Sequence, residues 1–208
     1  MDLDAVTIDA FGTLITLADP VGPLRAALAA RGVARTEDEV RHAFAAEVAY
    51  YVPRSHEGRD EATLALLRRD CARVFLDAAA APLDADEFTA AFLAALVFEA
   101  VPDAAAACRA LVAAGLRLAV VSNWDVGLEK HLAELGLDTL VDAIVTSAEA
   151  GAPKPAPAVF ELALTRLGAT PSRAVHIGDA PADEEGARAA GMRFELAPLA
   201  DAARRILA

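Results

Sequence analysis

The feature that most constrains the fold is a regular alternation of short and long segments after Pro102. Short, mostly apolar runs such as Leu116–Val121, Val141–Thr146 and Ala174–Ile177 alternate with helical stretches of about ten residues. Such runs are typical of strands buried on both faces, and the helices between them are typical crossovers of a parallel sheet. The sequence therefore predicts an α/β fold with a Rossmann-like parallel-sheet core, whose first strand is residues 5–9.

From about residue 20 to residue 98 the pattern differs, because helical periodicity dominates and no strand pattern interrupts it. Phe88 and Phe92, for example, share one face of an expected helix. We expect this stretch to be an all-α helical cap inserted after the first strand. The expected domains are a core of residues 1–15 and 100–208 and a cap of residues 16–99.

The composition excludes some classes of partner. Acidic residues outnumber basic ones 31 to 19, and the formal net charge of −12 argues against nucleic acid, whose binding depends on lysine and arginine. No apolar run approaches the roughly 18 residues of a membrane helix, and the acidic start Met1–Asp4 differs from a signal peptide. We expect no membrane contact and a cytoplasmic location, with Cys71 and Cys108 as buried thiols. The sequence leaves monomer and homodimer open.

Polar side chains follow the expected strands at the point where each strand ends. They are Asp9 after the first strand, Ser122 and Asn123 after the next, Lys154 in the loop beyond the third, and Asp179 and Asp183 after the fourth. The carboxyl ends of parallel strands meet at one edge of a sheet, where ligands bind. We therefore expect these side chains to share one cleft.

Three carboxylates in one cleft repel each other unless positive charge offsets them. Lys154 supplies one positive charge and leaves the group near −2. A divalent cation would bring the cleft near neutrality, and Mg²⁺ suits it because this ion prefers oxygen ligands and combines one or two carboxylates with substrate phosphate. The expected substrate is a small, anionic, phosphorylated molecule.

The same residues resemble the four motifs of the haloacid dehalogenase-like (HAD) superfamily, in the same order and over nearly the whole chain. The motifs are Asp9-Ala10-Phe11-Gly12-Thr13-Leu14, Ser122-Asn123, Lys154 within Gly-Ala-Pro-Lys-Pro, and Gly178-Asp179 continuing through Asp183 to Gly191. The helical insert resembles the cap that this family carries after its first motif. The stretch Val6–Ala27 also resembles a subgroup of phosphatase-like proteins whose substrate is undefined.

The resemblance implies a role for each residue. Asp9 would attack phosphorus and form an aspartyl-phosphate, with Lys154 offsetting charge in the transition state. Mg²⁺ would be bound by Asp9, by the backbone carbonyl of Phe11, by Asp179, and by Asp183 directly or through water. Ser122 and the backbone of Asn123 would bind a phosphoryl oxygen, and Thr13 would stabilise the turn or contact substrate.

Phe11 departs from the pattern of the family's phosphatases, which usually carry a second aspartate there to protonate the leaving oxygen. General acid catalysis contributes roughly 10²–10⁴-fold, so efficient turnover would require a good leaving group. The 2-haloacid dehalogenases of the superfamily carry an aromatic residue at this position, because halide leaves without a proton. They work without metal, however, and do not keep the acidic pair that Asp179 and Asp183 provide here.

Three interpretations therefore stand beside the Mg²⁺-dependent phosphohydrolase. One is a 2-haloacid dehalogenase with Asp9 as nucleophile, and another is a weakly catalytic binding or regulatory protein with the same fold. A receiver-type phosphoacceptor also gathers aspartates and a lysine on a parallel sheet. The long insert and the position of Lys154 after the third strand argue against the receiver.

Selectivity is expected to come from the insert, which would close over the cleft. Arg54, His56 and Arg59 lie between two expected helices and form a plausible set for binding an anionic substrate. A polar surface loop is the alternative for this segment. Trp124 follows the Ser-Asn motif and would either line the cleft or serve as a packing residue.

Overall fold

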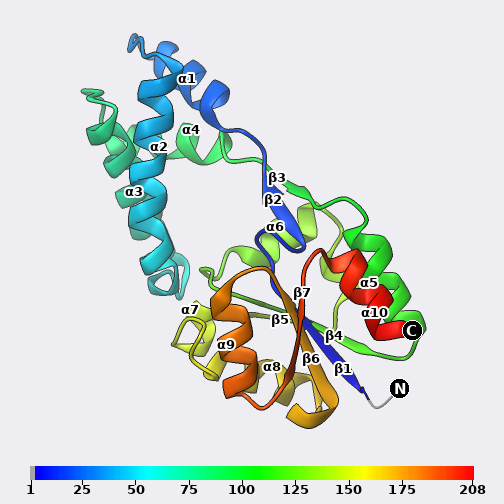
Figure 1. Cartoon of the computed structure of the whole chain (residues 1–208). Helices are drawn as coiled ribbons and strands as arrows, with labels where there is room; N and C mark the ends of the chain where they lie inside the picture. The colour runs from blue at the N-terminus through cyan, green and yellow to red at the C-terminus, as the bar shows by residue number, and fades with distance from the viewer. Residues whose placement is uncertain (1–2) are drawn as a thin grey trace. The chain divides into compact units, whose positions relative to one another are not determined.

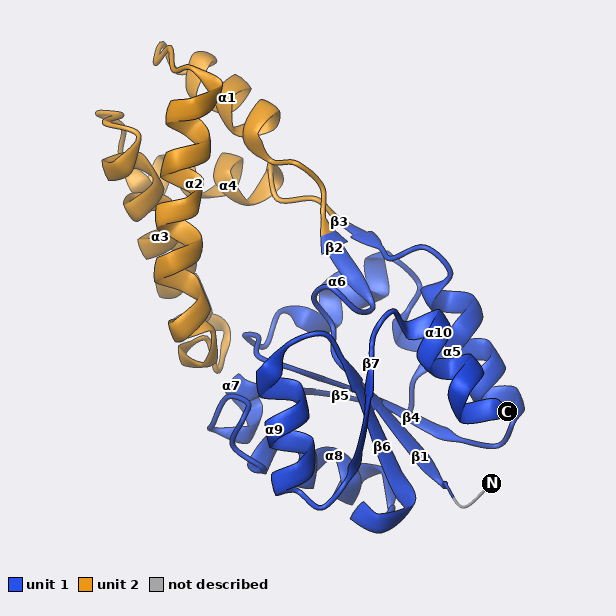
Figure 2. Ribbon diagram, viewed as in Figure 1, with its two compact units in different colours: residues 1–16, 99–208 blue, residues 17–98 orange. Residues whose placement is uncertain are grey.

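The computed structural model describes residues 3–208; residues 1–2, part of the acidic start and of the expected core, lie outside the described residues. The chain divides into two compact units (Figure 2). Unit 1 contains the residues up to Thr16 together with Glu99–Ala208, and unit 2 is Leu17–Phe98. In the described part of the chain, no helix is both long and apolar enough to cross a membrane.

Unit 1 is built on a five-stranded parallel sheet (Figure 1). Its strands are β1 (Ala5–Ile8), β4 (Arg117–Ser122), β5 (Ala143–Thr146), β6 (Ala174–Gly178) and β7 (Arg193–Leu196), in the order β5-β4-β1-β6-β7. The predicted α/β fold with a Rossmann-like parallel sheet is confirmed. Strand β1 lies at the centre and is fully buried, as apolar strands with neighbours on both sides must be.

Helices cover both faces of this sheet. They are α5 (Ala104–Ala113), α6 (Leu128–Glu134), α7 (Ser147–Ala150), α8 (Ala158–Leu167), α9 (Pro181–Ala189) and α10 (Leu199–Leu207), with short 3₁₀ turns η2 (Asp138–Leu140) and η3 (Pro171–Arg173). Helix α8 packs on β4 and β5, and α5 packs on β4 and α10. Ala119 and Val121 of β4 join the core cluster under α8, whereas the alternating residues Leu118 and Val120 are buried outside that cluster and point to the opposite face.

The strand register brings the ends of the central strands together. Ile8 of β1 pairs with Val120 of β4 on one side and with Ile177 of β6 on the other. The residue after Ile8 therefore lies level with Val121 of β4 and Gly178 of β6, at the ends of both neighbouring strands. This register puts Asp9 at the middle of the carboxyl edge.

The chain leaves and re-enters unit 1 through two three-residue strands, β2 (Ile15–Leu17) and β3 (Phe98–Ala100), which pair with each other. Residues 16–99 were expected to be helical throughout, so this expectation is wrong at the two ends of the stretch. Strands of three residues are too short to display an alternating pattern in the sequence.

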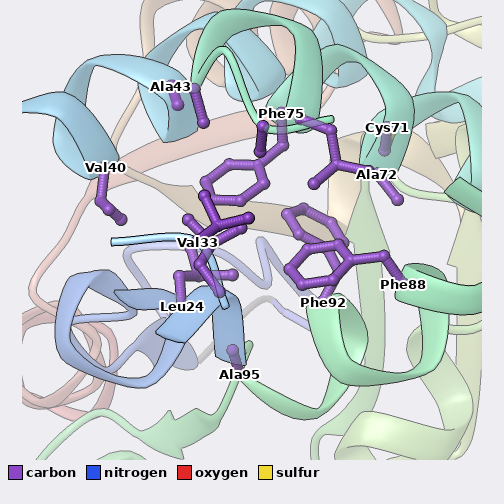
Figure 3. Packing of buried hydrophobic residues seen from close by; sticks show 14 of the residues in the cluster. Leu24, Val33, Val40, Ala43, Cys71, Ala72, Phe75, Phe88, Phe92 and Ala95 are labelled. Carbon is purple, nitrogen blue, oxygen red and sulfur yellow. The ribbon is translucent and has the colours of Figure 1, made fainter. Parts of the chain in front are cut away.

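Unit 2 contains helices together with the outermost residues of that strand pair. They are α1 (Val21–Ala29), α2 (Glu37–Tyr51), the 3₁₀ helix η1 (Val52–Glu57), α3 (Glu61–Ala78) and α4 (Ala85–Ala94). Its own core centres on three phenylalanine rings (Figure 3). Phe75 stacks on Phe88 with ring centroids 6.0 Å apart and tilts against Phe92 at 5.4 Å. Offset and tilted aromatic pairs of this kind stabilise a core beyond the area they bury.

Candidate active site

Asp9 follows β1 directly and is 5% exposed. Its backbone N–H donates to the carbonyl of Ile177 over 2.8 Å, which continues the β1–β6 ladder by one residue. The hydroxyl of Ser122, at the end of β4, donates to Oδ1 of Asp9 over 3.3 Å. The carboxylate is therefore held in the sheet edge with one oxygen engaged.

Lys154 lies in the loop after α7 and is buried. Its Nζ is 2.5 Å from Oδ1 of Asp9 and 2.5 Å from Oδ1 of Asp183, and it also donates to the carbonyl of Val121 over 3.1 Å. Burial alone would lower the pKa of Lys154, but the two carboxylates raise that pKa above its ordinary value. The lysine is thus a cation that bridges two acids.

Asn123 holds the backbone of Lys154 in position. Its Nδ2 donates to the Lys154 carbonyl over 3.1 Å, and its Oδ1 accepts from the Lys154 N–H over 2.6 Å. The two bonds satisfy both backbone groups of a residue that belongs to no helix or strand. The side chain of Asn123 therefore connects the end of β4 to the lysine loop.

The charge state of Asp9 depends on its surroundings. Burial raises the pKa of Asp9 to about 6, opposed by Lys154 and reinforced by the negative charges of Asp183 and Asp179. A cation bound beside this carboxyl group would lower the pKa and favour the ionised form. A further positive charge in the site would therefore keep Asp9 ionised, and nucleophilic, down to lower pH.

Asp183 is the most completely bonded acid of the site. Its Oδ1 accepts from Lys154 and from Nε2 of His176, the latter over 3.2 Å, and its Oδ2 accepts from the N–H of Ala180 over 3.0 Å. Although burial would raise the pKa of Asp183, the bond from His176 and the charge of Lys154 hold it well below its ordinary value. A carboxylate has about four acceptor sites, so one remains for a metal ion or a metal-bound water.

Asp179 is the exposed acid of the group. Ligand oxygens of Asp9, Asp179 and Asp183 all lie within 4.8 Å of one another. Asp179 is also seated against Gly12, where a Cβ would lie 2.3 Å from Oδ2, and Gly12 has a φ of +86°. The donor set is entirely oxygen and mostly anionic, which fits Mg²⁺.

The other predicted residues of unit 1 lie around this group. The side chain of Phe11 is 49% exposed and tilts against Trp124, with ring centroids 6.3 Å apart, while Trp124 is 7% exposed. Thr13 is buried, and its Oγ1 is a buried polar atom without a hydrogen-bond partner in the described part of the chain. An orphaned buried hydroxyl of this kind marks a position where water or a ligand oxygen would be bound.

The remaining predicted residues belong to unit 2. Arg54 and His56 lie in η1 rather than in a loop, and Arg59 follows that helix. Arg54 donates to the carbonyl of Tyr50 over 3.0 Å and lies 4.3 Å from the centroid of its ring. Contact of these side chains with substrate stays a prediction.

Two buried residues near the site carried no predicted role. Thr7 in β1 is hydrogen-bonded to Nδ1 of His176 in β6 over 2.8 Å, and both side chains are 0% exposed. From the sequence, His176 reads as a core histidine with a satisfied hydrogen bond, without indication that its partner is Asp183. The available signal was a polar residue at an interior position of each of two otherwise apolar strands.

Comparison of the sequence with known protein families identifies the family to which the chain belongs. A sequence profile of the haloacid dehalogenase-like hydrolases matches residues 3–191. The chain belongs to this family.

Curated relatives match a part of the chain. Haloacid dehalogenase-like hydrolase domain-containing protein 3 of Mus musculus is 47% identical over 79 residues, which are 38% of this chain and 32% of that protein. Ribulose-1,5-bisphosphate 5-phosphatase of Halopiger xanaduensis is 39% identical over 98 residues, 46% of this chain and 41% of that protein. The matched region spans about a third of the length of the first of these relatives.

Solved structures share the fold at low identity. A HAD phosphatase from Thermococcus onnurineus has a TM-score of 0.66 at 23% identity, over 99% of this chain and 98% of that one. L-2-haloacid dehalogenase from Xanthobacter autotrophicus has a TM-score of 0.64 at 24% identity, over 92% of this chain and 76% of that one. Both kinds of enzyme share this fold, so the choice between them depends on the site.

Proposed function

We propose that this chain is a Mg²⁺-dependent phosphohydrolase that acts on a small phosphate ester through an aspartyl-phosphate on Asp9. The observation that carries the proposal is the acidic group itself, in which oxygens of Asp9, Asp179 and Asp183 lie within 4.8 Å of one another. A dehalogenase has no ion to bind and no use for three clustered carboxylates. The family membership and the phosphatases among the relatives support the same reaction class.

In the proposed reaction an oxygen of Asp9 attacks phosphorus, the P–O bond to the leaving group breaks, and the leaving group departs with that electron pair. Water then attacks phosphorus, the bond between Asp9 and phosphorus breaks, and inorganic phosphate is released. Lys154 and Ser122, both bonded to Asp9, would offset charge on the phosphoryl oxygens, and the backbone of Asn123 would donate a further hydrogen bond. The Asp9 carboxylate is thus the nucleophile of the first step and the leaving group of the second.

Mg²⁺ would supply charge neutralisation between Asp9 and the phosphoryl group. The proposed ligands are Asp9, Asp179 and the backbone carbonyl of Phe11, with Asp183 contributing its one open acceptor site directly or through water. Thr13 would bind a water or a substrate oxygen with its free hydroxyl. The roles of the three aspartates are supported by the cluster of their oxygens, whereas the role of the Phe11 carbonyl is the one that the family resemblance implies.

Unit 2 is proposed to act as the cap that selects the substrate, with Arg54, His56 and Arg59 as candidate contacts for its anionic group. The proposed location is the cytoplasm, where the buried thiols of Cys71 and Cys108, which form no disulfide within residues 3–208, would stay reduced.

The test is hydrolysis of p-nitrophenyl phosphate with Mg²⁺ and with excess chelator, beside halide release from 2-chloropropionate. We expect Mg²⁺-dependent release of nitrophenol and no halide. Asp9→Asn should lower turnover by at least about 10³-fold while circular dichroism shows an unchanged fold. Chelator-insensitive halide release, or full activity of Asp9→Asn, would overturn the proposal.

A second candidate, 2-haloacid dehalogenase, is favoured by the aromatic side chain of Phe11. A single turnover in H₂¹⁸O separates the two reactions. In the phosphohydrolase water attacks phosphorus, so the label leaves with phosphate; in the dehalogenase water attacks the carbonyl carbon of the Asp9 ester, so the label stays on Asp9. We expect labelled phosphate and an unlabelled Asp9 peptide in mass spectrometry.

A further inference from the structure

Thr7 and His176 form a buried polar pair inside the sheet. They are register partners on the adjacent strands β1 and β6. Both are 0% exposed, and Oγ1 of Thr7 lies 2.8 Å from Nδ1 of His176. Their neighbours along each strand are apolar. The pair therefore places two polar groups in the core, where hydrophobic side chains would avoid the free-energy cost of desolvating a polar group.

The second ring nitrogen of His176 decides which way the hydrogen bonds run. Nε2 lies 3.2 Å from Oδ1 of Asp183. An ionised carboxylate only accepts, so Nε2 carries the ring proton; a neutral imidazole has one such proton, so Nδ1 accepts and the Thr7 hydroxyl donates. Burial lowers the pKa of His176 to about 4, in agreement with a neutral ring.

The hydrogen bonds continue from this pair to the nucleophile. Oδ1 of Asp183, which accepts from His176, also accepts from Lys154 over 2.5 Å, and Lys154 donates to Asp9 over 2.5 Å. The path from Thr7 to Asp9 is therefore continuous, and every step joins side chains that are at most 7% exposed.

Packing fixes the orientation of the imidazole. The ring of Phe160 meets His176 edge-on with centroids 4.9 Å apart. Phe160 itself is held against Gly186, where a Cβ would lie 2.5 Å from Cε2 of that ring. The histidine therefore has a bonded partner at each nitrogen and an aromatic wall beside it.

We propose that Thr7 and His176 are positioning residues of the nucleophile, which fix Oδ1 of Asp183 so that Lys154 stays between Asp183 and Asp9. The inference rests on the proposed function and adds two residues that are not among the proposed ligands of the metal or the substrate. A purely structural pair would contribute to stability and leave the catalytic step unchanged. A positioning pair changes kcat, because Lys154 must be aligned in the transition state, with little effect on KM.

The first test uses matched variants at each position. Glutamine sets an amide donor where Nε2 of His176 lies, whereas the shorter asparagine reaches only the position of Nδ1. We expect His176→Asn and Thr7→Val to lower kcat by about 10- to 100-fold with little change in KM, and His176→Gln and Thr7→Ser to restore most of the rate. Equal losses in His176→Asn and His176→Gln, or lower stability with unchanged kcat, would overturn the inference.

The second test needs no turnover. Nitrogen shifts of ¹⁵N-histidine in the wild-type protein report the tautomer of His176, assigned by the signal that His176→Gln removes from the four histidines. We expect a single neutral tautomer protonated at Nε2 in both the wild type and Thr7→Val, because Asp183 still accepts from Nε2 in the variant. The nitrogen shift of Nδ1 should change in Thr7→Val, because the hydroxyl that donates to this atom is lost. A ring protonated at Nδ1, or an unchanged Nδ1 shift in Thr7→Val, would overturn the positioning role. Silence in the phosphatase assay would overturn the proposed function alone.

Discussion

Phe11 stands where an acid would assist departure of the leaving group, and its side chain is 49% exposed. A carboxylate at this position would stay partly in water and need no buried partner. We predict that Phe11→Asp raises kcat on an alkyl phosphate at least about tenfold, since general acid catalysis contributes roughly 10²–10⁴-fold. Hydrolysis of p-nitrophenyl phosphate should change less, because nitrophenolate leaves without a proton.

Phe11→Leu is the control, since it removes the ring without supplying an acid. Equal rates for Phe11→Leu and Phe11→Asp on the alkyl phosphate would mean that only the size of the residue matters.

Gly12 tests whether Asp179 is a metal ligand. A methyl group there would meet Oδ2 of Asp179 at 2.3 Å, so Gly12→Ala should displace this carboxylate and raise the Mg²⁺ concentration for half-maximal activity several-fold. Gly115 is the matched control, because its φ of +85° is nearly the same as the +86° of Gly12 but no atom lies within 4 Å of its Cβ position. Both variants should lose about 1 kcal/mol of stability from the left-handed backbone.

Activity at increasing Mg²⁺ checks this prediction, with melting temperatures as the measure of stability. An unchanged Mg²⁺ requirement in Gly12→Ala would remove Asp179 from the proposed ligands.

At the residue scale, the sequence was sufficient to predict which side chains lie at the carboxyl edge of the sheet. It was not sufficient to predict which of them form ion pairs and hydrogen bonds with one another. The strand ends indicated that Asp9, Lys154 and Asp183 would lie near one another, because parallel strands end at a common edge. One ammonium group bridges both acids at 2.5 Å. This bridge depends on the path of residues 151–157, a seven-residue stretch without regular structure or a side-chain pattern. The link from Thr7 to His176 depends on the register of β1 and β6, which the apolar pattern of these strands does not reveal.

Helix α2 carries a buried acid that the site does not use. Glu47 is 5% exposed in unit 2, and burial raises its pKa to about 7 from an ordinary value of 4.5, against the effect of a hydrogen bond with Cys71. The folded state therefore binds a proton more tightly than the unfolded state. The contribution of protonated Glu47 to the free energy of unfolding is therefore fully present below about pH 4.5 and is lost as the pH rises through 7.

We predict that Glu47→Gln is more stable than the wild type at pH 8 by about 3 kcal/mol, at roughly 1.4 kcal/mol per pH unit, with the difference vanishing near pH 4.5. Urea unfolding at several pH values measures it. Asp38→Asn, which changes an exposed acid of the same helix, should show no such pH dependence. A Glu47→Gln curve parallel to that of the wild type would contradict the prediction.

At the element scale, length determined what the sequence could predict. The run Ala174–Ile177 became β6 (Ala174–Gly178), and the expected helix that carries Phe88 and Phe92 became α4, because several consecutive residues supported each assignment. The three-residue strands β2 and β3 and the four-residue α7 were not predicted. Their formation depends on partners elsewhere in the chain rather than on a local pattern.

For the whole molecule, the negative net charge and the candidate site have opposite electrostatic effects on an anionic substrate. A net charge of −12 repels a phosphorylated substrate, whereas the buried ammonium of Lys154 attracts it. The proposed Mg²⁺ resolves this conflict locally, since a divalent ion at short range outweighs charges that salt screens beyond about 10 Å. Removal of the metal should therefore affect stability as well as turnover.

Mg²⁺ at ten times its dissociation constant would stabilise the folded protein by about 1.4 kcal/mol. For a chain of this length, we predict a rise in melting temperature of roughly 3 °C. The rise should be absent in Asp179→Asn and retained in Glu184→Gln, which alters a partly exposed carboxylate of α9 that pairs with Arg188. Hydrogen exchange should slow in β1 and β6 of unit 1 and stay unchanged in α2 and α3, because unit 2 has its own core. An equal rise in Asp179→Asn would mean that Mg²⁺ binds the acidic surface instead of this site.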